Sequence, residues 1–408
     1  MEAPLWKVAL DESAVVAGGA LIPGRLYVAS REGFLYAIGA GKPLAPEVHT
    51  AATTKTSQSE KINWLDLADD PIGPRTAQAR LFFQDEGGLV GGPAVSQDGT
   101  VFIPSKSGDL YALDTMGKVV WKATLPAPPV GAPVVGQDGT VYQVDKDGGL
   151  SAFDQQGGLL WHFQPQTAIY GMDGPSVGPD GSIYYVVGNY AKGSIQAVSV
   201  EGKSLWLAPL KSNRFFLSPR ASPDGKFVFF RGEVFDARDG SAIDFALPFE
   251  VDEYIVGQDG RTYLRAKGTV VEWTHNGSEV ELKEARVLAD DPKPISAGVT
   301  SQGVVWLLSG DNAVWFARDG EALGAAHSEI WSRVLVGVDQ DFTIYTCGHG
   351  AGYWSDPSCV RLSPRSPDPI WRVRLTARSE NLLGGALAPG RMYFALEGGE
   401  LFVIEGQS

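Results

Sequence analysis

The sequence lacks a basic run, a long apolar run and an amino-terminal targeting segment. Its formal net charge is −14, with 34 Lys and Arg residues against 48 Asp and Glu. A protein that neutralises phosphates needs a basic stripe, so nucleic acid and an anionic membrane surface are excluded as expected partners. No stretch approaches the roughly 18 apolar residues of a membrane helix, and the first residues show no basic and apolar leader.

Sequence motifs for catalysis and metal binding are also missing. The 5 histidines show no metal-binding spacing, and no G-x-S-x-G elbow occurs. Asp145-Lys-Asp147-Gly resembles the start of a calcium loop, but its twelfth position is Gln156 instead of glutamate. We therefore expect no bound metal. The sequence favours a non-enzymatic protein and leaves catalysis open.

Glycine, in contrast, is abundant, and it recurs with a fixed period. The chain has 50 glycines and 26 prolines at an ordinary hydrophobic content of 44%, which indicates many short strands. Residues 95–121 and 135–161 align without a gap at an offset of 40, and five landmark positions keep register. Such a period is typical of four-stranded propeller blades. The sequence therefore predicts an all-β fold, a single β-propeller over residues 1–408.

The number of blades follows from the turn that opens each repeat. An Asp-Gly or Pro-Gly pair fits a tight turn that needs positive φ. Nine turns at this repeat position can be counted. Eight have the glycines 24, 99, 139, 181, 225, 260, 303 and 390, of which Gly303 follows Gln302, and the weakest turn is at Asp341. The count predicts nine blades. Eight is the alternative, because propellers usually have four to eight.

The two ends of the chain suggest how the ring closes. The last repeat stops before any outer strand with tryptophan, and the first residues, PLWKVAL, match VVWKATL at 119–125. Trp6 precedes Gly24 by the same spacing that separates Trp121 from Gly139. We expect residues 1–13 to form the outer strand of the C-terminal blade and to remove an open seam.

The repeat pattern DGTVY…DGxLYALDxxGxxxW resembles that of the pyrroloquinoline-quinone-like propeller superfamily. That superfamily includes quinoprotein alcohol dehydrogenases and the propeller lipoprotein of the bacterial outer-membrane β-barrel assembly machinery. Its quinone enzymes hold the cofactor with a disulfide between adjacent cysteines, and Cys347 and Cys359 are not adjacent. We expect no cofactor, and the repeats themselves indicate fold more than function.

Two departures from the repeat are the candidate binding segments. The first is an insert at residues 43–83 within the first blade, because long excursions from a rigid scaffold often carry binding residues. The alternative is a lid that packs on the propeller without a ligand. The candidate residues of the insert are Trp64, Asp66, Asp69, Asp70 and Arg75.

The second departure is the glycine-rich loop between Cys347 and Cys359. Pairing of the flanking strands would bring the cysteines together, so we favour a disulfide and an oxidising compartment over two free thiols in the cytoplasm. The candidate binding residues of this loop are His349, Tyr353 and Trp354.

Together these features favour a non-catalytic binding scaffold of the bacterial cell envelope, whose partner is another protein. On this interpretation the chain is a periplasmic or cell-surface mature form, from which an export signal or a lipid anchor was removed. A small-ligand or enzymatic propeller with a site at one mouth of the channel is the first alternative. An extracellular sensor domain of a larger receptor is the second.

Overall fold

The structure is a computed structural model, and its description covers strands, turns and connecting segments of the chain. The described residues are 16–22, 25–30, 35–39, 78–165, 170–171, 174–189, 192–211, 218–245, 251–257, 259–266, 269–276, 279–283, 294–299, 305–309, 313–318, 321–327, 331–338, 343–349, 357–363, 366, 368–375 and 381–405.

The chain divides into two compact units, residues 1–62 and residues 63–408, where the repeats predict one domain. The first unit contains an antiparallel three-stranded sheet of β1 (Val16–Ile22), β2 (Arg25–Ser30) and β3 (Leu35–Gly39). This sheet is the copy of the repeat that begins at Pro23.

The second unit contains eight antiparallel sheets, which we number along the chain. Sheet 1 has β5 (Ala94–Val95), β6 (Val101–Pro104), β7 (Asp109–Leu113) and β8 (Val119–Thr124). Sheet 2 has β9 (Val134–Val135), β10 (Val141–Val144), β11 (Leu150–Phe153) and β12 (Leu159–Phe163). Sheet 3 has β13 (Tyr170–Gly171), β14 (Ser176–Val177), β15 (Ile183–Asn189), β16 (Lys192–Val198) and β17 (Ser204–Pro209). Sheet 4 has β18 (Arg220–Ala221), β19 (Phe227–Phe230), β20 (Glu233–Asp236) and β21 (Ala242–Ile243).

The remaining four sheets follow the same plan, except that the outer strand of the last sheet comes from an earlier part of the chain. Sheet 5 has β22 (Glu253–Val256), β23 (Thr262–Ala266), β24 (Thr269–Asn276) and β25 (Glu279–Lys283). Sheet 6 has β26 (Pro294–Val299), β27 (Val305–Ser309), β28 (Ala313–Arg318) and β29 (Glu321–His327). Sheet 7 has β30 (Trp331–Val338), β31 (Ile344–His349), β32 (Pro357–Leu362) and β33 (Trp371–Arg374). Sheet 8 joins β34 (Leu382–Ala388), β35 (Arg391–Leu396) and β36 (Glu400–Glu405) to β4 (Gln78–Gln84).

Carboxylates and glycines make the turns of each sheet. In sheet 1 the Gly99 amide donates to the Ser96 carbonyl at 3.0 Å, and Gly99 has φ +87°. The Asp98 carboxylate accepts the Thr100 amide at 3.1 Å, which fixes the same turn from the side. The second strands that follow these turns, such as β6 and β10, are buried along their whole length. The Asp-Gly pattern thus acts as the sequence predicts, as a turn signal before a buried strand.

The apolar core lies between neighbouring sheets. Phe102 and Leu110 of sheet 1 pack with Val141 and Phe153 of sheet 2 in one buried cluster. Comparable clusters join sheet 2 to 3, 3 to 4, 4 to 5, 7 to 8 and 8 to 1. Face-to-face packing of successive four-stranded sheets is the arrangement of propeller blades.

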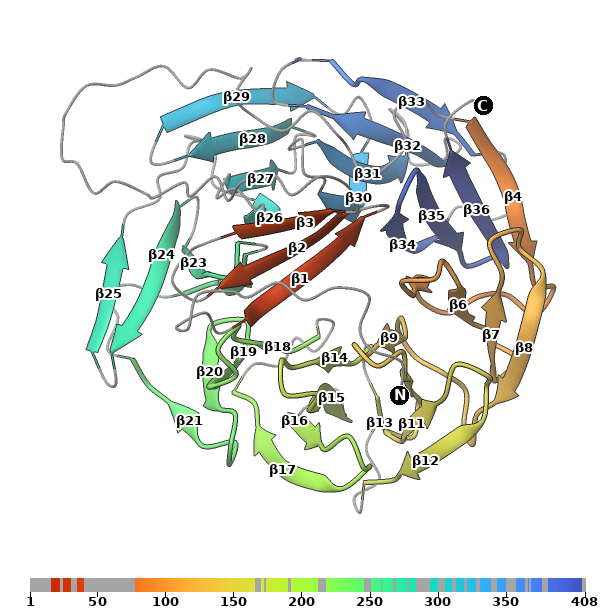
Figure 1. Cartoon of the computed structure of the whole chain (residues 1–408), viewed down its shortest axis with the longest axis horizontal. Coiled ribbons are helices and arrows are strands. Elements are labelled where there is room, and N and C mark those ends of the chain that lie inside the picture. The colour runs from red at the N-terminus through yellow and green to blue at the C-terminus, as the bar shows by residue number, and fades with distance from the viewer. Residues whose placement is uncertain are drawn as a thin grey trace. The chain divides into compact units, whose positions relative to one another are not determined.

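The outer strand of the C-terminal sheet differs from the sequence prediction. The sequence assigns this place to residues 1–13, which lie outside the described residues. The structure fills it with β4, which pairs antiparallel with β36 from Glu405 opposite Gln78 to Glu400 opposite Gln84. Figure 1 shows β4, in orange, beside β36, in dark blue. An edge strand has one free side, and on β36 this side is paired with β4.

The count of nine blades is not confirmed. Each of the nine counted positions lies along the chain between two paired strands of a separate sheet. Eight of these sheets lie in the unit of residues 63–408, and the ninth is the three-stranded sheet of the other unit. No helix in the described part of the chain is long and apolar enough to cross a membrane.

Candidate protein-binding surface

The outer strands of sheets 1, 2 and 3 expose aliphatic side chains to solvent. Val120 on β8 is 60% exposed, Leu160 on β12 is 53% exposed and Leu205 on β17 is 47% exposed. Among the described residues, no further strand pairs with the outer edge of these strands. We call the exposed set the outer-strand patch; it comprises Val119, Val120, Leu159, Leu160, Leu205 and Leu207.

A β-bulge in each outer strand explains the exposure. In sheet 1, Trp121 lies opposite Ala112 and Val119 lies opposite Leu113, so Val120 is the extra residue without a partner. The same irregularity makes Leu160 the extra residue of β12. Bulges redirect side chains and interrupt pairing, so these edges present side chains instead of a regular ladder. Leu205 of β17 occupies the equivalent position.

The tryptophan beside each bulge points inward and joins one sheet to the next. The Trp121 indole N–H donates to the Gln155 carbonyl of sheet 2 at 3.0 Å. A side-chain carbon added to Gly157 would lie 2.6 Å from Cδ2 of Trp121, so only glycine allows the close approach. Trp161 and Trp206 make the same kind of contact with sheets 3 and 4. These contacts agree with a packing role for the tryptophans.

The strands under the outer-strand patch carry no acidic side chain, although Asp114, Asp154 and Glu201 lie in the turns before them. The strands β8, β12 and β17 contain no Asp or Glu, although the whole chain carries −14. Lys118 and Lys203 are exposed immediately before β8 and β17. Lys122 on β8 extends toward Asp109, with 2.9 Å between Nζ and Oδ2. A surface of aliphatic and cationic groups is complementary to an apolar surface with acidic neighbours.

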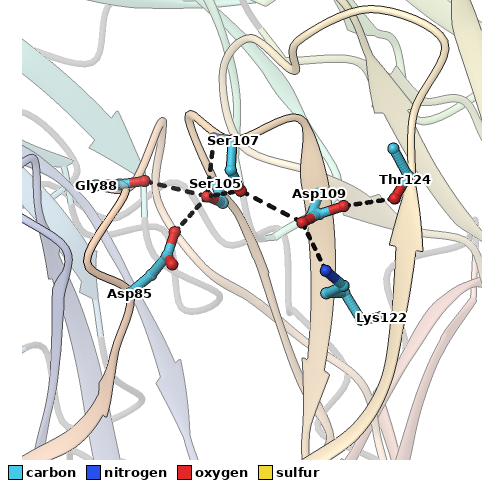
Figure 2. A network of polar contacts seen from close by, with 7 residues as sticks. All are labelled: Asp85, Gly88, Ser105, Ser107, Asp109, Lys122 and Thr124. Atoms are coloured by element: carbon cyan, nitrogen blue, oxygen red, sulfur yellow. Dashed lines mark hydrogen bonds and ion pairs between the residues drawn. The ribbon is translucent and has the colours of Figure 1, made fainter.

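A network of polar side chains joins β8 to the neighbouring strand β7, and Figure 2 shows its members. The Asp109 carboxylate accepts from the Thr124 hydroxyl at 2.6 Å and from the Ser107 hydroxyl at 3.3 Å, besides its ion pair with Lys122. Burial raises the pKa of Asp109, but the bonds from Thr124 and Lys122 outweigh it and lower this pKa overall. The Ser105 hydroxyl links the network to Asp85. The carboxylate is thus held ionised by its neighbours, which suits a structural role.

In sheet 2 the buried carboxylate stands at a different position of the repeat than in sheet 1. Asp145 stands where sheet 1 has Ser105, and Gly149 stands where it has Asp109. Oδ1 of Asp145 accepts the amides of Asp147 and Gly149 at 3.0 and 2.8 Å. Oδ2 is buried without a hydrogen-bond partner within the described part, and burial raises the pKa of this carboxyl. Asp145 therefore stabilises a turn through Oδ1, while burial of Oδ2 disfavours its ionised form. No group of three or more metal-ligating side chains occurs among the described residues.

The structure joins the two cysteines in a disulfide. Cys347 on β31 and Cys359 on β32 lie opposite each other, with Cα atoms 4.1 Å apart and sulfurs 2.06 Å apart. Both are buried within the cluster between sheets 7 and 8. The geometry agrees with the disulfide interpretation of the sequence and not with two free thiols.

Of the predicted binding residues, the structure describes one. His349 is the last residue of β31 and is buried, opposite Pro357 in the strand register. The loop residues Tyr353 and Trp354 lie outside the described residues. The same is true of five residues of the insert, namely Trp64, Asp66, Asp69, Asp70 and Arg75.

The sequence prediction did not include the outer-strand patch, although its aliphatic residues recur beside the repeat tryptophan. An apolar pair precedes the tryptophan in VVW and LLW, and SLWL carries leucine on both sides. Strict alternation would bury every second residue of such a strand. The bulge breaks that alternation, and it is not visible in the sequence.

Comparisons with known proteins agree with this fold. A family model for the outer membrane protein assembly factor BamB matches residues 47–215. The solved structure of BamB from Moraxella catarrhalis is similar with a TM-score of 0.54 and 18% identity, covering 80% of this chain and 96% of that one. No curated protein matches the sequence.

A second group of similar structures is enzymatic. Virginiamycin B lyase from Staphylococcus aureus has a TM-score of 0.50 at 14% identity, covering 81% of this chain and 99% of that one. A catalytically inactive variant of that lyase with quinupristin has a TM-score of 0.51 at 12% identity, with the same coverage. At such identities the likeness concerns the fold alone. The BamB model and the described sheets together confirm the resemblance of this chain to the pyrroloquinoline-quinone-like propeller superfamily.

Proposed function

We propose that the protein is a non-catalytic binding scaffold of the bacterial cell envelope, whose outer-strand patch contacts another protein. The observation that carries the proposal is the recurrence of an exposed aliphatic residue at the bulge of three successive outer strands. Isolated exposed aliphatic residues are ordinary, but a repeated set at one structural position marks an interaction surface. The set lies within residues 47–215, the part matched by the BamB family model.

The partner would present apolar side chains with acidic neighbours. The patch offers aliphatic groups, the lysines beside it are cationic, and its strands carry no carboxylate. Opposite charge at the rim would steer the partner, while burial of the aliphatic groups would supply affinity. The bulges disfavour addition of a regular strand, so side chains would make the contact.

Compartment and ring closure belong to the same proposal. The disulfide of sheet 7 supports an oxidising compartment, such as the periplasm or the cell surface. We infer that sheets 1 to 8 close into one eight-bladed ring. Contacts run from sheet 7 to sheet 8, from sheet 8 to sheet 1, and then between each successive pair of sheets as far as sheet 6. The insert residues and the loop at Tyr353 and Trp354 stay proposed as a second contact region.

Site-specific photo-crosslinking in the cell envelope tests the proposal. A photoreactive side chain would replace Val120 or Leu160 in the patch, Gln97 in an exposed turn as control, and Trp354 in the second region. We expect one protein adduct from Val120 and Leu160 and none from Gln97. Equal adducts at every position, or no adduct at Val120 and Leu160, would contradict a partner on the patch. An adduct from Trp354 alone would place the partner on the loop.

A further inference from the structure

The junction between sheet 8 and sheet 1 lacks the tryptophan contact found between sheets 1 and 2, 2 and 3, and 3 and 4. In sheets 1 to 3 the tryptophan on the outer strand donates to a turn carbonyl of the following sheet. In sheet 8 the outer strand is β4, and Arg80 stands opposite Val403 where Trp121 stands opposite Ala112 in sheet 1. A cationic residue therefore occupies the tryptophan position.

Another arginine reaches the equivalent carbonyl. The acceptor at the first Trp junction is Gln155, and the residue 40 positions before it is Thr115. Arg391, at the start of β35, donates from Nη1 to the Thr115 carbonyl at 2.5 Å. Its Nε lies 3.2 Å from Oε2 of Glu405, whose Oε1 lies 2.8 Å from Nε of Arg80. A charged group thus replaces the neutral indole donor.

One ion pair crosses the same junction. Lys106, in the turn between β6 and β7, has its Nζ 2.5 Å from Oε1 of Glu397 in sheet 8. The Asn381 side chain donates to the other oxygen of Glu397. The hydrogen bond from Lys106, followed by that from Asn381, lowers the pKa of Glu397, so this carboxylate is ionised at neutral pH.

We propose that the junction between sheets 8 and 1 is a salt-sensitive opening point of the propeller. Salt shortens the Debye length from about 10 Å at 0.1 M to about 3 Å at 1 M and screens half-exposed charges. The indole hydrogen bonds between sheets 1 and 2, 2 and 3, and 3 and 4 carry no net charge and are not screened in this way. Apolar contacts of Phe82 and Tyr393 remain at the junction, so salt loosens it without unfolding it.

Hydrogen exchange followed by mass spectrometry tests this on the full chain. Peptides from residues 78–84 and 400–405 report on sheet 8, and peptides from 150–163 report on a tryptophan junction. Between 0.05 M and 1 M KCl we expect exchange in the sheet 8 peptides to quicken about two- to fivefold, in line with weak surface ion pairs. The peptides from 150–163 should change less than the sheet 8 peptides.

Three variants distinguish screening of the charges at this junction from a general effect of salt on the protein. Lys106→Met, at an exposed position, removes the ion pair that crosses the junction, so it should quicken exchange in the sheet 8 peptides at low salt and remove most of the salt dependence. Arg391→Met removes the charged donor to the Thr115 carbonyl and should also quicken this exchange at low salt. Arg238→Met removes an ion pair within sheet 4 and should leave sheet 8 unchanged. Equal salt effects on both sets of peptides, or an unaltered salt response in Lys106→Met, would overturn the proposal.

Discussion

Substitution of Gly157 by alanine should separate the tryptophan contact from backbone strain. Gly157 has φ +85°, and an added Cβ would meet Cδ2 of Trp121 at 2.6 Å. Gly108 has φ +97° in a comparable turn, and nothing lies within 4 Å of its added Cβ. In both variants a residue with a Cβ must adopt the left-handed conformation, which lowers the free energy of unfolding by about 1–2 kcal/mol. Only Gly157→Ala also has to move the indole by about 1 Å, since carbon atoms pack at about 3.5–4 Å.

The difference between the two variants measures the contact. Forced repacking costs about 1–3 kcal/mol, so Gly157→Ala should lower the free energy of unfolding by that much more than Gly108→Ala. Urea unfolding followed by far-ultraviolet circular dichroism gives both values, and Gly202→Ala at Trp161 provides a repeat of the test. Equal losses in Gly157→Ala and Gly108→Ala would refute the idea that Trp121 joins sheet 1 to sheet 2.

Two further predictions concern the disulfide and the buried carboxylate. Cys347→Ala with Cys359→Ala should lower the free energy of unfolding by about 3 kcal/mol, the loop-closure value for a short loop. In the unsubstituted protein, thiol titration after denaturation should find free thiols only when the protein has first been reduced. Burial raises the pKa of Asp145 in the folded state, so ionisation of this carboxyl destabilises the fold. The destabilisation is absent at pH values below the unfolded-state pKa and is complete once the pH has risen through the folded-state pKa. Asp145→Asn should therefore raise the urea midpoint at pH 7 and lose that gain toward pH 3. Asp114→Asn is the matched control, because Asp114 accepts amides at the same two positions but has a lowered pKa, and it should not raise the midpoint.

The repeats made much of the sheet plan predictable. Asp98 and Gly99 are local signals, since the carboxylate and the positive φ act within one turn. Trp121 was also interpretable, because a large residue at a fixed repeat position indicates packing between repeats. The disulfide could be anticipated because both cysteines flank one short loop.

What the sequence could not reveal depends on contacts between distant segments. β4 escaped notice because Arg80 stands where the repeat has tryptophan, and its strand partner lies more than 300 residues away. Trp6 precedes Gly24 by the spacing of the repeat tryptophan, and this match led the sequence prediction to residues 1–13 instead of β4. Exposure of Val120 depends on a bulge, which follows from the pairing of two strands and not from the residues of either one.

Cysteine trapping between β4 and β36 tests the central claim that β4 completes the C-terminal sheet. Ala79 and Ile404 lie opposite each other in the strand register. In the variant with Ala79→Cys and Ile404→Cys, mass spectrometry of an unreduced digest should find the two introduced cysteines linked. If they stay unlinked, and Ile404→Cys instead links to Pro4→Cys in a second variant, the amino-terminal segment is the outer strand and the account is wrong.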